Sequence, residues 1–129
     1  MENMGSKIEN PAQEIQALKE RLQTLDSSYG ESSVEKAGPE IVREALTRHL
    51  EETRERASDG YKMSPEEAHR CSLNIEEKKT EEGRISALFE LAQDKGITNA
   101  FEVAKGLHNP HLLDVFHDAF IKRHDEFLG

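Results

Sequence analysis

Tryptophan is absent from this chain of 129 residues, and cysteine occurs only once. A lone cysteine excludes an intramolecular disulfide and a multi-cysteine metal cage, so Cys71 fits a reducing, cytoplasmic location. No stretch approaches the ~18 consecutive apolar residues of a membrane span, and residues 1–10 lack the basic and then apolar run of a secretory signal. These absences predict a cytoplasmic protein without a membrane partner.

Aromatic residues are also scarce, at 5% of the chain, and all five phenylalanines lie between Phe89 and Phe127. Burial of apolar surface drives folding, at roughly 25 cal/mol per Å². The distribution therefore places the core in the last third of the chain. A three-helix unit of about 45 residues there is near the lower size limit for independent folding, so earlier helices or a partner should cover its phenylalanines.

Basic residues are outnumbered, and the formal net charge at pH 7 is −9. The excess of acid is spread over both halves of the chain and is not confined to a tail. An evenly acidic surface favours solubility and repels phosphate backbones and anionic lipid. The composition therefore argues against nucleic acid as a partner.

Proline and apolar spacing predict two helices in the first half. Asn10 and Pro11 form a helix start, with a cap residue followed by proline at the first helical position. Pro39 opens the second helix. The apolar stripe of the first helix is Ile15, Leu18, Leu22 and Leu25, and the second presents one face made of Val42, Ala45, Leu46, His49, Leu50 and Thr53. The intervening residues 26–38, rich in serine and glycine, are expected to form a mobile connector.

Ser64 and Pro65 signal another helix start. Residues 68–79 have few apolar side chains and no clean period, which leaves a marginal helix and a connector as alternatives. Three further helices follow. The first stops at Gly96 and has an apolar face made of Ile85, Leu88, Phe89 and Ala92. The second is short, is capped by Thr98 and stops at Gly106. The third starts at Asn109 and Pro110, and its apolar face is Leu112, Leu113, Phe116, Ala119, Phe120 and Phe127.

No β pattern occurs, so the sequence predicts an all-α fold: a small helical bundle with a C-terminal three-helix unit and peripheral N-terminal helices. The expected domains are an N-terminal helical extension over residues 1–63 and a C-terminal helical domain over residues 64–129.

Histidine is the residue that most invites a chemical interpretation. His111, Asp114 and Asp118 share one side of the last helix and are weak candidates for a metal site, with a solvated polar face as the alternative. His49 lies within an apolar stripe, which favours a satisfied core histidine. His117 and His124 lie at the edge of the last apolar face, either as a pH-sensitive surface or as boundary residues.

Cys71 and His69 are two residues apart and would face apart on a helix, which argues against a cysteine nucleophile. We therefore expect no catalytic residue, no metal and no cofactor, and a non-enzymatic protein.

The last third resembles the tri-helical arrangement of helix-turn-helix DNA-binding domains. Two short helices flank a tight turn at Gly106, and the apolar residues that agree with the family pattern are Leu107, Leu112 and Val115. Glu102 and Lys105 depart from it, where the family usually has a small residue and an apolar one. The resemblance implies a regulatory DNA-binding function, but no lysine or arginine precedes Lys122 in the third helix to contact phosphate.

The expected function is a helical protein-protein interaction or adaptor module that binds a protein partner or a second copy of itself. Apolar anchors of this kind dominate typical interfaces. The expected partner-binding residues are Leu18, Leu22, Leu25, Leu113, Phe116, Phe120 and Phe127. The alternative is that these faces cover one another within a single chain.

Overall fold

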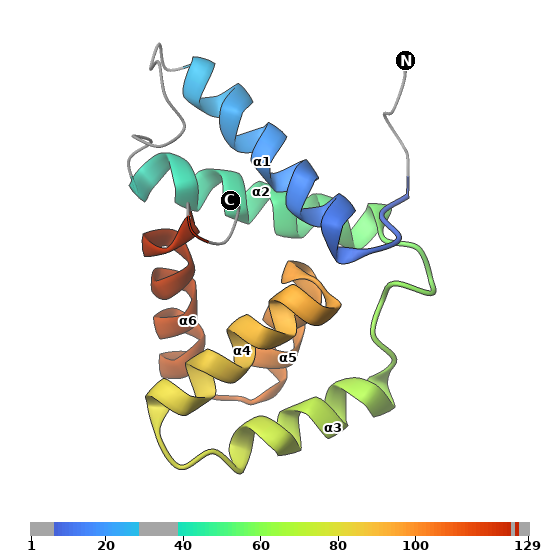
Figure 1. Ribbon diagram of the computed structural model, residues 1–129, viewed down its shortest axis with the longest axis vertical. Helices are drawn as coiled ribbons and strands as arrows, with labels where there is room; N and C mark the ends of the chain where they lie inside the picture. Colours follow the sequence, from blue (N-terminus) through green and yellow to red (C-terminus); the bar gives the residue numbers. More distant parts are fainter. Residues whose placement is uncertain (1–6, 29–38, 125, 127–129) are drawn as a thin grey trace.

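The computed structural model describes residues 7–28, 39–124 and 126, and within them it contains only α-helices as regular elements (Figure 1). The all-α helical bundle is confirmed. The helices are α1 (Pro11–Ser28), α2 (Pro39–Arg56), α3 (Pro65–Glu76), α4 (Glu81–Lys95), α5 (Ile97–Gly106) and α6 (Pro110–Lys122). None of the helices in this part of the chain is long and apolar enough to cross a membrane.

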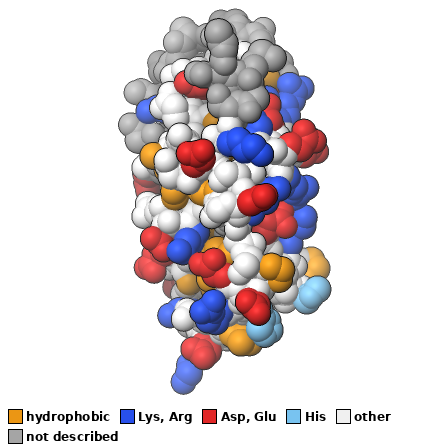
Figure 2. All heavy atoms as spheres, turned by 90° about the vertical axis from the view of Figure 1, so that its right-hand side faces the viewer, with side chains coloured by type: hydrophobic (Ala, Val, Ile, Leu, Met, Phe, Trp, Pro, Cys, Tyr) orange, Lys and Arg blue, Asp and Glu red, His pale blue; other side chains and the backbone are white. Residues whose placement is uncertain are grey.

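The helices form two groups that meet at one core. α1 lies across α2 at one end of the molecule, and α3 closes the other end (Figure 1). α4, α5 and α6 lie between them, with α4 packed on both α5 and α6 and with α3 packed mainly on α5. On the side of the molecule drawn in Figure 2, side chains of both signs are interspersed and no continuous patch of one charge forms.

The helix starts that the sequence predicts are confirmed at three prolines. In each case the cap side chain accepts a hydrogen bond from the backbone N–H three residues later: Asn10 from Gln13 at 2.9 Å, Ser64 from Glu67 at 3.1 Å and Asn109 from Leu112 at 3.1 Å. These bonds satisfy backbone donors that a helix leaves free at its N-terminus.

Several local predictions need correction. α3 continues as a regular helix to Glu76, so most of residues 68–79 are helical. α5 starts at Ile97, and Thr98 does not cap it, because its hydroxyl donates to a carboxylate of α1 instead. The predicted stop of this helix at Gly106 is confirmed, and the left-handed residue of the turn that follows is His108, with φ 56°.

The four phenylalanines among the described residues form the centre of the core, as predicted. Phe101 and Phe116 have ring centroids 4.5 Å apart, Phe89 meets Phe116 edge-on at 5.3 Å, and Phe89 stacks on Phe120 at 6.2 Å. The same core also includes residues of both N-terminal helices: Leu18, Leu22, Val42, Ala45 and Leu46. The chain thus buries its aromatic rings together with its first half. The domain division after residue 63 stays a prediction, and residues 29–38 of the expected connector lie outside the described residues.

Candidate functional site

The predicted partner-binding residues are mostly core residues. Leu18, Leu22, Phe116 and Phe120 are each exposed by 3% or less. Leu25 and Leu113 are half-buried, and Phe127 lies outside the described residues. Both stripes belong to one core: the α1 stripe packs mainly on α2, and the α6 face packs on α4, α5 and α2. A partner could reach the four buried side chains only if the core opened.

The three metal candidates on α6 are not brought together with further ligands. His111 Nε2 lies 3.0 Å from Glu81 Oε1, whereas Asp118 Oδ1 accepts from Arg43 at 3.0 Å, on a different helix. No group of three or more histidine, cysteine, aspartate or glutamate side chains within the described ranges could hold a metal ion. His111 and Asp118 thus pair with side chains of two different helices, and Asp114 is exposed.

The remaining predicted histidines lie at the boundary of the core. His117 is half-buried, and burial together with the adjacent Arg43 guanidinium lowers its pKa. His124 is 8% exposed, and its Nδ1 lies 2.9 Å from the carbonyl oxygen of Ile121. Neither histidine faces a carboxylate at hydrogen-bond distance among the residues described.

A buried polar cluster centres on Glu14 of α1, whose side chain has no exposed surface. Its Oε2 lies 2.8 Å from His49 Nε2 and accepts hydrogen bonds from the Thr98 backbone N–H at 2.7 Å and the Thr98 hydroxyl at 2.5 Å. The carboxylate therefore occupies the N-terminus of α5, where free N–H groups and the helix dipole favour an anion. One side chain of α1 thus connects α2 with α5.

Tyr61 completes this cluster by donating its hydroxyl to Glu14 Oε1. Burial and the Glu14 charge raise the pKa of Tyr61 far above its usual value, so the phenol remains a donor. Gly96 gives the phenol room, since a Cβ there would lie 1.6 Å from the Tyr61 oxygen, and its φ of 112° favours glycine.

The charge state of Glu14 follows from these contacts. Burial alone raises the pKa of the carboxyl, but the hydrogen bond and electrostatic attraction of His49, with the hydrogen bonds of Thr98 and Tyr61, hold the pKa below its ordinary range. Glu14 is therefore a fully bonded anion at neutral pH, as buried charges generally require.

The cluster brings together the residue types of a nucleophile–base–acid triad, but in an unsuitable geometry. Thr53 Oγ1 lies 3.3 Å from one ring nitrogen of His49 and 3.5 Å from the other, so the hydroxyl meets the ring from the side. A general base must bond the group that it activates and also reach the substrate. His49 is 1% exposed. The prediction of a satisfied core histidine is confirmed, and the cluster is structural.

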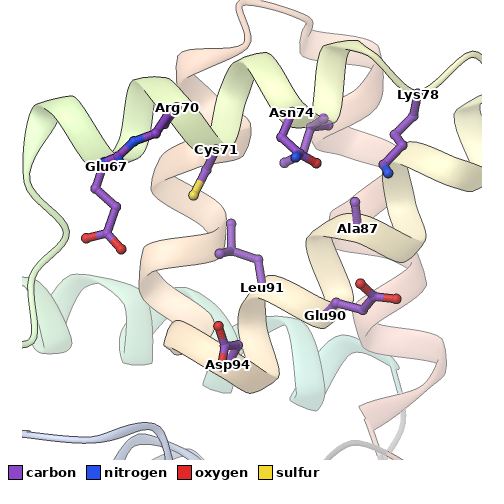
Figure 3. Close-up of a pocket in the computed structure, with 10 residues that line it drawn as sticks. Glu67, Arg70, Cys71, Asn74, Lys78, Ala87, Glu90, Leu91 and Asp94 are labelled. Atoms are coloured by element: carbon purple, nitrogen blue, oxygen red, sulfur yellow. The ribbon is translucent and has the colours of Figure 1, made fainter.

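An open groove between α3 and α4 is the more suitable binding surface (Figure 3). It encloses about 550 Å³, within the range of ligand and peptide sites. Its apolar lining comes from both helices: Cys71 and Ile75 of α3, and Ala87 and Leu91 of α4. Ile75 is buried and the other three are half-buried, so the floor is apolar but accessible.

Charged side chains line both edges of this groove. Arg70, Asn74 and Lys78 lie along α3 and just beyond its end, while Glu90 and Asp94 lie along α4. Glu67 of α3 pairs with Lys95 of α4 at 3.4 Å, and this pair bridges the two helices. Apart from this pair, the charged lining residues are basic on the α3 edge and acidic on the α4 edge.

Cys71 contributes a thiol to the floor, and its chemistry agrees with the sequence expectation. Burial and the negative charge of Glu67 raise the thiol pKa, which keeps the sulfur protonated and weakly nucleophilic. The side chain therefore acts in the groove as a small apolar surface.

Sequence reasoning missed both the Glu14 cluster and the groove. Glu14 is four residues before Leu18 and therefore lies on the apolar face of the same helix. A carboxylate at such a position indicates a buried anion. The groove had no comparable signal, because nothing in the sequence places α3 beside α4. No protein-family model, curated protein or solved structure matches the chain.

Proposed function

We propose that this protein is a non-enzymatic interaction module that binds a helical segment of a partner protein in the α3–α4 groove. The observation that carries the proposal is the accessible apolar floor between two helices, flanked by charged edges. Helix-in-groove recognition uses this arrangement: apolar anchors enter the floor and polar side chains meet the rims.

The groove replaces the leucine and phenylalanine faces as the expected contact. Phe116 and Leu22 are buried at 0% and 1% exposure, so substitutions there would disturb folding before they reported on binding. Leu91 and Ala87 are half-buried in the groove and can be changed with less damage to the core. The DNA-binding alternative gains no comparable support, because Asp114 and Asp118 are exposed on α6.

The test is a display selection of helical peptides against the full chain, followed by binding measurements on matched variants. Leu91→Glu places a charge in the floor, and Leu73→Glu is the control, since Leu73 is 47% exposed on the same α3 but is not part of the groove. Selected peptides should bind with roughly micromolar Kd, typical of a small interface. They should lose about tenfold or more in affinity on Leu91→Glu and little on Leu73→Glu.

Ala87→Trp, which fills the groove without adding charge, provides a second variant if Leu91→Glu proves unfolded by circular dichroism. The proposal is overturned if no peptide is enriched over scrambled sequences, or if both folded groove variants bind as the parent does. It is also overturned if light scattering shows a dimer that Leu91→Glu dissociates, because the occupant would then be a second copy of the chain.

A further inference from the structure

The two edges of the groove carry opposite charges at helical spacing. Arg70 and Asn74 are four residues apart and follow one line along α3, and Lys78 lies just beyond the end of this helix at Glu76. Glu90 and Asp94 are four residues apart and follow one line along α4. Figure 3 shows the two sets projecting from the two helices that border the groove.

None of the four charged rim side chains forms an ion pair within residues 7–28, 39–124 and 126, a state that they share with other exposed charges such as Glu51 and Lys122. These four are Arg70, Lys78, Glu90 and Asp94. By contrast, Arg43 pairs with Asp118 and Arg54 with Glu102. The rims can therefore bind an occupant's charges without first breaking a pair within the chain.

The dimensions of the groove limit the occupant. The helical part of its α3 edge extends from Glu67 to Ile75, which at 1.5 Å per residue is roughly 12 Å, and Lys78 lies beyond the end of α3, so an occupant that meets both ends of this edge spans about three helical turns. The small side chains Cys71 and Ala87 leave room above the floor for larger aliphatic anchors. A helix of this length with one apolar stripe fits the space.

We infer that the occupant is an amphipathic helix of about three turns with acidic side chains along one flank of its apolar stripe and basic side chains along the other. The acidic flank meets Arg70 and Lys78, and the basic flank meets Glu90 and Asp94. This inference rests on the proposed function and adds the chemistry of the partner. Charge complementarity of this kind contributes more to specificity and association rate than to affinity.

The charge pattern also fixes the direction of docking. A helix turned end for end in the groove exchanges the flanks that face the two rims. Only one direction therefore places the acidic flank of the bound helix against the α3 edge and its basic flank against the α4 edge. A helix with two flanks of the same sign meets like charge on one rim in either direction, which is unfavourable.

The test compares three labelled peptides of about 18 residues with the same leucine stripe and with Glu/Lys, Lys/Lys or Glu/Glu flanks. Fluorescence anisotropy with the full chain at low salt should give a Kd for the Glu/Lys peptide that is about tenfold lower than the Kd of either other peptide. The preference should shrink in roughly 0.5 M salt, because exposed charges are then screened. Protection of the Cys71 thiol from a maleimide reports occupancy of the groove independently.

A rim reversal makes the test sharper. Glu90→Lys with Asp94→Lys makes both rims basic, so the Glu/Glu peptide should become the tightest binder. The matched control is Glu51→Lys with Glu55→Lys, which makes the same charge change at the same spacing on the exposed side of α2. This control should bind the Glu/Lys peptide most tightly, as the parent protein does.

The outcomes separate the two proposals. If the three peptides bind and protect Cys71 equally, and the rim reversal changes nothing, the inferred flank chemistry is wrong while the groove remains a binding site. If none binds or protects Cys71, and the display selection also enriches nothing, the proposed function is overturned as well.

Discussion

At the scale of residues, the decisive group is the Glu14 carboxylate. It bonds His49 of α2, Thr98 of α5 and Tyr61 of the α2–α3 loop, and it has no contact with solvent. Removing one partner of a buried charged pair costs about 3–5 kcal/mol, because the other partner is left uncompensated. The stripe that was expected to bind a partner instead carries this anion into the core.

Replacing Glu14 by glutamine should lower the free energy of unfolding by about 2–4 kcal/mol at pH 7. Because the pKa of Glu14 is lowered in the folded state, its ionised form stabilises the fold above the unfolded pKa of about 4.3, and this contribution is lost as pH falls through the folded pKa. Urea unfolding of both proteins between roughly pH 7 and 3 should show that the difference in their free energies of unfolding becomes smaller below about pH 4.

The control is Glu51→Gln at an exposed position of α2, and its free energy of unfolding should stay within about 0.5 kcal/mol of that of the parent at each pH. A difference for Glu14→Gln that keeps its full size down to pH 3 would contradict the role assigned to the carboxylate.

At the scale of elements, α3 is the least firmly held helix in the described part of the chain. Ile75 is its one buried residue, whereas α5 buries most of its length. Its N-terminus is well capped by Ser64, so α3 is locally well formed, but most of its contact with the core is made by partly buried side chains such as Ala68 and Cys71. A groove wall of this kind can adjust to an occupant, because regions with few buried contacts open at low free-energy cost.

The substitution Ile75→Ala should reduce stability by about 2–4 kcal/mol, since it removes the buried anchor of α3. Leu73→Ala, two residues away and exposed, should change stability by no more than about 0.5 kcal/mol. Hydrogen exchange followed by mass spectrometry should show faster exchange of α3 amides in Ile75→Ala, with α4 and α6 affected less. Equal acceleration in all helices would show that α3 does not open locally.

At the scale of the whole molecule, the core is shared between the two halves. Leu18, Leu22 and Leu46 pack in the same cluster as Phe116 and Phe120. An independent C-terminal domain over residues 64–129 would have to fold with that surface uncovered. At this size a partly exposed core leaves little net stability.

The full chain should therefore unfold in urea as one cooperative transition, with the same midpoint by far-UV circular dichroism and by tyrosine fluorescence. A fragment of residues 64–129 should retain helical signal but lose the sharp transition, as loosely packed helical states do. A sharp transition of the fragment near the parent midpoint would instead support the predicted domain division.

The sequence by itself determined the all-α class, the caps at Asn10, Ser64 and Asn109, and the apolar faces of the helices other than α3, for which it left a connector as an alternative. These features depend on residues within about one turn of each other, so local spacing contains them. It also indicated that His49 is a core residue, because that histidine interrupts an apolar face.

Only the tertiary structure decided which faces meet. It buried the leucine stripe of α1 mainly against α2 and the phenylalanine face of α6 against α4 and α5, brought Glu14 to the start of α5, and placed α3 beside α4 to form the groove. The apolar pattern of a helix says that a face is buried but not against what. That choice depends on how all the helices can pack at once, which is a property of the whole chain.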